Sequence, residues 1–142
     1  MLKSIRNQME KYKNRMEKGK FTQNIDQIPE QEKTSCFLMA VYEGNKARVQ
    51  ELLENGVNIN CATPREDTAL MCAIVNENEP MVRLLLDKGA KVDHVNSNGF
   101  TALMCAVNRG NEALVQLLLN KGAKVDYANP EGFTPLMCAV VN

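Results

Sequence analysis

Aromatic residues are scarce in this 142-residue chain, which contains four Phe, three Tyr and no Trp. Because aromatic residues are enriched in strands, a core built mainly from Leu, Val, Ala, Met and Cys favours packed helices over a sheet. No apolar run is long enough to span a membrane as a helix, and no apolar stretch near the N-terminus resembles a secretory signal. Five cysteines without such a signal indicate a reducing compartment. We therefore expect an intracellular protein, located in the cytoplasm with the nucleus as the alternative.

The sequence also lacks an overall charge bias, since 17 Lys and Arg residues balance 17 Asp and Glu residues. This balance gives the whole molecule no general attraction to nucleic acids or membranes. The charge is nevertheless uneven, because residues 1–20 contain seven basic and two acidic residues, a net charge of +5. Apolar residues of that segment recur at steps of three and four, as on one face of a helix: Leu2, Ile5, Met9, Tyr12 and Met16. We predict a basic amphipathic helix over residues 1–20 and a Gln-rich linker over residues 21–33.

An internal repeat of 33 residues dominates the rest of the sequence. The segment Thr-Ala-Leu-Met-Cys-Ala at 68–73 returns at 101–106, and at 134–139 with Pro as its second residue. A weaker copy begins one step earlier, around Ser35 and Phe37. The predicted repeat domain covers residues 34–142, with repeats at about 30–62, 63–95 and 96–128 and a partial repeat at 129–142.

Each repeat has the residues of two helices and an extended loop. Thr101 has the hydroxyl group that caps a helix start, and Gly110 ends the first helix. The second helix carries apolar residues at helical spacing: Leu114, Val115, Leu118 and Leu119. Gly122 ends that helix in the left-handed conformation that glycine adopts at little cost. Residues 124–132 then form an extended excursion with turn-forming residues.

This pattern resembles the ankyrin repeat, in which Gly-x-Thr-Pro-Leu-His precedes the first helix and Leu-Leu-Leu-x-x-Gly-Ala belongs to the second. The resemblance covers residues 30–142 and implies an all-α ankyrin-repeat solenoid of helix–turn–helix units with hairpin loops. Three methionines replace the family's histidine: Met71, Met104 and Met137. Because that histidine ties neighbouring repeats by polar contacts, we expect methionine packing in its place. Repeat 2 has Glu66 where its neighbours have Gly99 and Gly132, which predicts a distorted hairpin.

The two ends of the array differ. Repeat 1 carries Arg48 and Glu51 where later repeats have apolar residues, as expected for the polar face of a capping unit. The last repeat has no second helix to support three apolar residues: Leu136, Met137 and Val140. We expect either further repeats beyond residue 142 or coverage of this end by self-association. The alternative is a frayed half-repeat that costs little stability.

The predicted N-terminal helix has three interpretations that stay open. It packs as a cap on repeat 1, it pairs with a helix of a partner, or it makes weak contact with an anionic membrane surface. The segment is weakly hydrophobic and has no Trp or Phe, which disfavours the membrane. It also lacks the interleaved aromatic residues of proteins that bind single-stranded nucleic acid, so nucleic acid is not an expected partner.

Residues with catalytic or metal-binding chemistry are poorly placed for either role. One position in successive repeats is always cysteine: Cys72, Cys105 and Cys138. Neighbouring helices lie about 8–10 Å apart, too far for a disulfide. Cys61, His94 and Tyr127 form a second column in the hairpins, and the same spacing is too wide for one metal ion. We therefore expect reduced structural cysteines, exposed hairpin residues, and neither enzyme activity, metal nor cofactor.

Ankyrin-repeat proteins usually bind other proteins through their hairpin tips and the inner face of the first helices. Carried onto this sequence, that surface consists of Tyr42, Arg65, Asp67, Asn76, Asn98, Phe100, Asn108, Arg109, Glu131 and Phe133. Phe100 and Phe133 are the strongest candidates, because the core does not require an aromatic residue at a hairpin tip and such residues are frequent hot spots. The alternative is that both rings lean onto their own helices.

The resemblance therefore implies a non-catalytic adaptor or scaffold whose partner is another protein. A function of a different class also stays open. The sequence would then be the targeting or regulatory region of a larger protein whose catalytic or effector domain lies beyond residue 142.

Overall fold

The computed structural model describes residues 6–7, 10–11, 14 and 25–140. Over residues 25–140 a 3₁₀ turn is followed by seven α-helices and no strand: η1 (Ile25–Gln27), α2 (Glu30–Tyr42), α3 (Lys46–Glu54), α4 (Ala69–Val75), α5 (Glu79–Asp87), α6 (Ala102–Asn108), α7 (Glu112–Asn120) and α8 (Pro135–Val140). One isolated β-bridge pairs Ala62 with Thr68. No helix in the described part of the protein is both long and apolar enough to cross a membrane.

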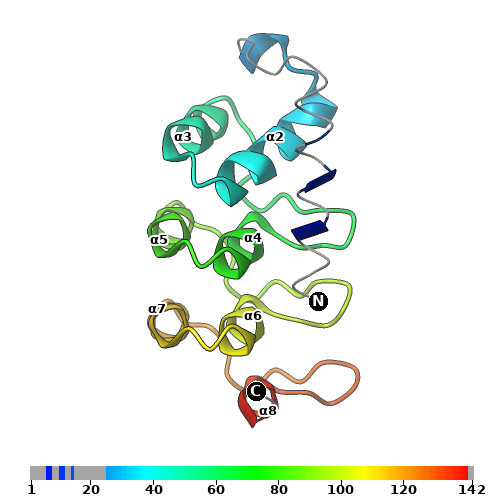
Figure 1. Ribbon diagram of the computed structural model, residues 1–142, viewed down its shortest axis with the longest axis vertical. Helices are drawn as coiled ribbons and strands as arrows, with labels where there is room; N and C mark the ends of the chain where they lie inside the picture. The colour runs from blue at the N-terminus through cyan, green and yellow to red at the C-terminus, as the bar shows by residue number, and fades with distance from the viewer. Residues whose placement is uncertain (1–5, 8–9, 12–13, 15–24, 141–142) are drawn as a thin grey trace.

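The helices form two columns (Figure 1). In the first column α2, α4, α6 and α8 stack one above another, and in the second α3, α5 and α7 stack beside them. Successive units contact each other through both columns, since α4 lies against α2 and α6, and α5 lies against α7. Loops between the units project beyond the first column. The predicted all-α solenoid of helix–turn–helix units is confirmed.

The core lies between the two columns and between successive units. All seven residues of α4 are buried, because this helix has neighbours on every side. Two of the methionines at the family's histidine position, Met71 and Met104, are fully buried, whereas Met137 of α8 is 49% exposed. A flexible thioether side chain therefore fills the space between units wherever a following unit is present.

The helices of the central units each begin at a side chain that caps them. The hydroxyl groups of Thr68 and Thr101 accept hydrogen bonds from the N–H groups of Met71 and Met104, at 3.4 and 3.3 Å. The second helix of each unit begins at an asparagine with the same role: Asn45, Asn78 and Asn111. Helices of seven or nine residues are marginal in water on their own. Caps and packing between units are therefore both needed.

The segment before α2 differs from the predicted linker over residues 21–33. Ile25–Gln27 form η1, and α2 already begins at Glu30. Ile25 and Ile28 are 2% and 5% exposed and belong to the same core as the repeats. Burial of two isoleucine side chains explains the difference, because it fixes a segment whose glutamines suggested a solvated linker.

Most of the predicted helix over residues 1–20 lies outside the described residues. This holds for all of its apolar positions: Leu2, Ile5, Met9, Tyr12 and Met16. The residues of this segment that the structure describes are helical with exposed side chains: Arg6, Asn7, Glu10, Lys11 and Asn14. The amphipathic helix stays a prediction, and residues 21–24 of the predicted linker also lie outside the described part.

The hairpin of repeat 2 is not distorted, contrary to the prediction from Glu66. Its φ is 62°, close to the 76° and 82° of Gly99 and Gly132 at the equivalent positions. The hairpin also closes normally, since the N–H of Thr63 donates to the carbonyl oxygen of Asp67 at 3.0 Å. Glu66 thus adopts a left-handed conformation, which costs a residue with a side chain about 1–2 kcal/mol.

Glu66→Gly should stabilise the protein by about 0.5–1 kcal/mol, because relief of the left-handed strain exceeds the added entropy of the unfolded state. Glu43→Gly is the matched control. Glu43 has an ordinary φ of −77°, so this variant should lose about 0.5 kcal/mol. Urea unfolding followed by circular dichroism measures both changes. Equal losses in the two variants would show that Glu66 is not strained.

Candidate functional site

The loops between units end in three stacked hairpins: hairpin 2 (residues 63–67), hairpin 3 (96–100) and hairpin 4 (129–133). They follow one another beside the first helix column (Figure 1). The side-chain oxygen of the first residue of each hairpin accepts hydrogen bonds from N–H groups of the tip. Asn96 Oδ1, for example, accepts from Asn98 and Phe100 at 3.1 and 2.9 Å, and Asn129 acts likewise in hairpin 4. Each tip is therefore held in one conformation by its own side chain.

Hairpins 2 and 3 are joined by polar contacts at their tips and in their interior. At the tips, the N–H and the hydroxyl group of Ser97 both donate to the carbonyl oxygen of Arg65, at 3.0 and 2.5 Å. In the interior, the amide nitrogen of Asn96 donates to the carboxylate of Asp67 at 2.7 Å. Asn96 and Asp67 are 3% and 1% exposed, so this hydrogen bond is shielded from water.

Neither contact can form between hairpins 3 and 4, because the residues at the equivalent positions are different. Pro130 takes the place of Ser97 and has no N–H to donate. Phe100 takes the place of Asp67, so the amide of Asn129 has no carboxylate opposite it. Two substitutions thus remove the two contacts that close the preceding junction.

A third contact of hairpins 2 and 3 has no counterpart between hairpins 3 and 4. It involves the equivalent positions Cys61, His94 and Tyr127. His94 Nε2 lies 3.1 Å from the carbonyl oxygen of Glu66 and joins hairpins 2 and 3. Tyr127 occupies the equivalent position in the next unit, and no hydrogen bond to hairpin 3 replaces that of His94 among the described residues. All three residues of the column are half-buried, in contrast to the exposed positions predicted for them, because they face the neighbouring unit.

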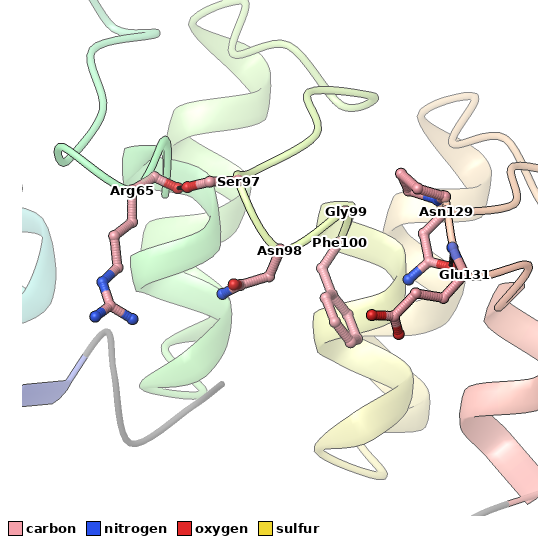
Figure 2. A pocket seen from close by; sticks show the side chains of 8 residues that line it. Arg65, Ser97, Asn98, Gly99, Phe100, Asn129 and Glu131 are labelled. Carbon is pink, nitrogen blue, oxygen red and sulfur yellow. Dashed lines mark hydrogen bonds between the residues drawn. The ribbon is translucent and has the colours of Figure 1, made fainter.

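A groove of about 620 Å³ opens between hairpins 3 and 4. It is lined by Arg65, Ser97, Asn98, Gly99, Phe100, Asn129, Pro130 and Glu131. Figure 2 shows Arg65 and Glu131 at opposite ends, with the ring of Phe100 between them. The hairpins approach most closely at Gly99, where a Cβ atom would lie 2.8 Å from the Cβ atom of Asn129. A larger residue at Gly99 would therefore force the two hairpins apart.

Two polar groups that line the groove have no hydrogen-bond partner among the described residues. The carbonyl oxygen of Asn98 is equivalent to that of Arg65, but it accepts no hydrogen bond. The amide nitrogen of Asn129 is equivalent to that of Asn96 and donates none, although Asn129 is only 5% exposed. Neither group is sealed from solvent, since Asn98 is exposed and the Asn129 amide nitrogen is not among the buried unpaired side-chain atoms. The groove therefore offers one accessible acceptor and one accessible donor to a ligand.

Four of the ten predicted binding residues come together in this groove: Arg65, Asn98, Phe100 and Glu131. Phe100 is half-buried and packs against the core, as the alternative interpretation of its ring proposes. Phe133 is 41% exposed and does not line the groove. Of the two rings, that of Phe100 therefore lines the groove and that of Phe133 does not. Their role as adjacent anchors stays a prediction.

Asp67 was predicted at the binding surface, and its burial corrects that prediction. Its carboxylate joins hairpins 2 and 3 through Asn96 and also accepts a hydrogen bond from Thr63 at 3.4 Å. Burial raises the pKa of Asp67, although these two hydrogen bonds act in the opposite direction. The residue thus belongs to the interior and is not available to a partner.

The remaining predicted residues lie at the ends of the first-column helices, where they connect neighbouring units. The amide nitrogen of Asn76 donates to the carbonyl oxygen of Tyr42 at 2.6 Å. Arg109 pairs with Glu77 at 2.8 Å and thereby lowers the pKa of that carboxyl group. Asn108 is half-buried. These residues contribute first to cohesion between units, so the groove is the better candidate for a binding site.

Asn129 and Gly99 are groove residues that the sequence analysis did not single out. A comparison of equivalent positions in the repeats could have indicated Asn129. Asparagine is kept at positions 96 and 129, while the residue opposite it changes from Asp67 to Phe100. A donor that recurs in the repeat while its acceptor is lost indicates a polar group available to another molecule.

The cysteines are not arranged for catalysis or metal binding. Burial raises the pKa of the Cys105 and Cys61 thiols to about 12, and it raises the pKa of the fully buried Cys72 as well. A thiol with a raised pKa is a poor nucleophile at neutral pH. None of the five cysteines forms a disulfide, and within the described residues no group of three or more His, Cys, Asp or Glu could hold a metal ion.

Comparison with known proteins identifies the family of the repeats. A family model described as ankyrin repeats in three copies matches residues 14–96, 37–129 and 89–142. Together these overlapping matches run from residue 14 to the last residue, which includes all three hairpins and the groove. A search of curated proteins found no match.

Asp67→Asn tests the buried carboxylate through its pH dependence. Because the pKa of Asp67 in the folded protein lies above the ordinary value of 3.8, the folded state binds this proton more tightly than the unfolded state does. The contribution of Asp67 to the free energy of unfolding of the wild type therefore falls as the pH rises from 3.8 through the raised pKa. The variant lacks this charge, so its free energy of unfolding relative to the wild type should increase over that range and then level off.

Urea unfolding of both proteins at a series of acidic and neutral pH values measures this difference. Contributions from other carboxyl groups, such as Glu77 with its lowered pKa, have the opposite sign and cancel between the two proteins. A difference that stays constant with pH would mean that Asp67 ionises as readily in the folded state as in the unfolded one.

Proposed function

Because the protein belongs to the ankyrin-repeat family, whose repeats are generally protein–protein interaction modules, we propose that it is a non-catalytic adaptor that binds a partner protein at hairpins 3 and 4. The observation that carries the proposal is the groove between these hairpins, whose lining has a donor and an acceptor that bond to no described residue. At the junction between hairpins 2 and 3 both equivalent groups have partners, because the carbonyl oxygen of Arg65 accepts from Ser97 and the amide nitrogen of Asn96 donates to Asp67. That junction therefore leaves nothing comparable for a partner.

The composition of the groove and its surroundings supports a protein partner. Phe100 provides an aromatic surface, while Asn98 and Glu131 provide polar groups at the rim, which is the usual arrangement of a binding hot spot. A protein interface buries about 800 Å² on each partner, more than the groove alone can supply. The exposed ring of Phe133, which belongs to hairpin 4 but does not line the groove, would extend the interface. Cysteines that form no disulfide suit the reducing cytoplasm that we propose as its location.

Phe100→Ala together with Phe133→Ala, made in the full-length protein, should reduce partner recovery by about tenfold or more, since a hot-spot ring contributes about 2 kcal/mol or more. Affinity capture followed by mass spectrometry measures the recovery. Because Phe100 also packs against the core, circular dichroism must show that the variant keeps its helices at the capture temperature.

A second pair of variants and a matched control separate binding from folding. Asn98→Ala with Glu131→Ala removes two exposed side chains of the groove and should also reduce recovery. Arg83→Ala with Gln116→Ala removes two exposed side chains from α5 and α7 and should leave recovery unchanged. A partner recovered equally by the wild type and by both groove pairs would move the binding surface away from hairpins 3 and 4.

Self-association through α8 is a second candidate, favoured by an exposed apolar surface. Leu136 and Val140 are 74% and 80% exposed, whereas Leu103, equivalent to Leu136 in the preceding unit, is 3% exposed. A patch of this kind usually marks a contact with another molecule. A second copy of the protein would cover the patch through the same residues on both sides.

Leu136→Glu with Val140→Glu should abolish any concentration-dependent dimer of the wild type, because charged residues oppose burial of this patch. Sedimentation velocity over a range of protein concentrations measures the change. Val125→Glu is the matched control, since Val125 is an apolar residue that is 60% exposed in a loop away from α8. A wild type that stays monomeric at all concentrations would rule out this second function.

A further inference from the structure

We propose that the groove between hairpins 3 and 4 binds an extended peptide segment of the partner, with a Lys or Arg side chain placed at Glu131. This inference rests on the proposed function and adds the chemistry of the ligand. Its grounds are the carbonyl oxygen of Asn98 and the amide nitrogen of Asn129, which have no hydrogen-bond partner among the described residues, and the carboxylate of Glu131.

The preceding junction shows which chemical groups the groove lacks. There, Ser97 supplies an N–H and a hydroxyl group to the carbonyl oxygen of Arg65, and Asp67 supplies an oxygen to the amide nitrogen of Asn96. A ligand in the groove must therefore bring a donor to the carbonyl oxygen of Asn98 and an acceptor to the amide nitrogen of Asn129.

A peptide backbone has both kinds of group at every residue. Each residue of an extended segment, except proline, offers one N–H and one C=O, and segments that add to hairpin or sheet edges bind through these groups. The hairpin tips that flank the groove are rigid, because Asn129 Oδ1 accepts hydrogen bonds from the N–H groups of Glu131 and Phe133 at 3.0 and 2.8 Å. The donor and the acceptor of the groove are therefore positioned before the peptide arrives.

The charge of Glu131 selects a neutral carbonyl group over a carboxylate as the acceptor in the peptide. Figure 2 shows the Glu131 side chain beside Asn129 and the ring of Phe100. A ligand carboxylate at the Asn129 amide would lie close to this negative charge, whereas a backbone carbonyl group would not be repelled. A basic side chain gains twice at the same end, from the ion pair with Glu131 and from contact with the face of Phe100.

Arg65 lies at the opposite end of the groove (Figure 2). Among the residues that line the groove, Glu131 alone has a carboxylate, so a Lys or Arg side chain of the peptide finds an opposite charge at the hairpin 4 end. The basic residue of the peptide consequently lies at hairpin 4.

Pools of acetylated octapeptides test the proposal on the full-length protein. In each pool one central position is fixed as Arg, Lys, Gln, Leu or Glu and the others are mixed, and fluorescence anisotropy measures binding. The Arg and Lys pools should bind about threefold to fivefold more tightly than the Glu pool, the range that an exposed ion pair supplies. Glu131→Lys should reverse this preference, while Glu112→Lys on the outer helix α7 should leave it unchanged. Equal binding of all pools, or no binding of any, would overturn the proposal.

Pro130→Ser tests whether the open carbonyl group of Asn98 matters. Serine at this position copies hairpin 3, where Ser97 donates to the preceding tip, so it should close the groove. We expect weaker binding of the Arg pool by about tenfold and a Tm that is higher by a few degrees. Pro64→Ser is the matched control, because Pro64 is the equivalent residue of hairpin 2 and the preceding unit begins with α2 instead of a hairpin. Unchanged binding in Pro130→Ser would contradict the proposed peptide contact.

Asn129→Asp tests the donor separately from the fold. The variant keeps an oxygen for the two N–H groups of hairpin 4 and loses the donor, so its Tm should change little. Asn96→Asp places a second carboxylate against Asp67 and should lower the Tm markedly. Equal losses in the two variants would show that the Asn129 amide already has an acceptor.

Failure of the peptide inference differs from failure of the proposed function. If no pool shows a basic preference but the Phe100 and Phe133 variants still lose the captured partner, the adaptor function stands and the peptide inference is wrong. If partner capture is also independent of the groove variants, both are wrong.

Discussion

The structure depends on burial of the first-column helices by neighbours on both sides. The seven residues of α4 are too few for a stable helix in water, yet all are buried between α2, α5 and α6. Nearly the same sequence in α8 leaves Leu136 and Val140 mostly exposed, because no described residue covers that side. Position in the stack, more than residue type, therefore decides which side chains are buried, and stability is the sum of contacts between neighbouring units.

Polar contacts between hairpins are a second kind of contact between units. They differ from one junction to the next, although the packing of the first-column helices is the same. Helices pack against each other at both junctions, α4 against α6 and α6 against α8, whether or not the hairpins beside them are joined, so the contacts between hairpins can change while the fold is kept. Hairpins 2 and 3 are joined through Ser97, Asn96 and His94. At the next junction Pro130 and Tyr127 remove two of these contacts, and Phe100 removes the acceptor of the third. Three substitutions thus convert a closed surface into a groove without any change in the helices beneath it.

The fold could be predicted from the sequence because its determinants are local and repeated: helix caps such as Thr101, turn glycines and apolar spacing at 33-residue steps. The site could be predicted only in part. Arg65, Asn98, Phe100 and Glu131 were found from their position in the repeat, but Asp67 was misplaced because its burial depends on Asn96, 29 residues later. The role of Asn129 depends on a hydrogen bond that does not form, which only the arrangement of two units in space reveals.

Ligand binding in the groove also affects the stability of the unit that contains hairpin 4 and α8. One wall of the groove belongs to hairpin 4, whose helix α8 has a neighbour on one side only among the described residues. A ligand that bonds to Asn98 in one unit and Asn129 in the next supplies contacts that the two hairpins do not make with each other. Because each unit of the stack contacts only its neighbours, the ligand stabilises the junction between the unit of Asn98 and the unit of Asn129. Hairpins 3 and 4 lack the contacts that join hairpins 2 and 3, and this lack opens the groove. For the same reason, the stability of hairpin 4 depends on the ligand that the groove binds.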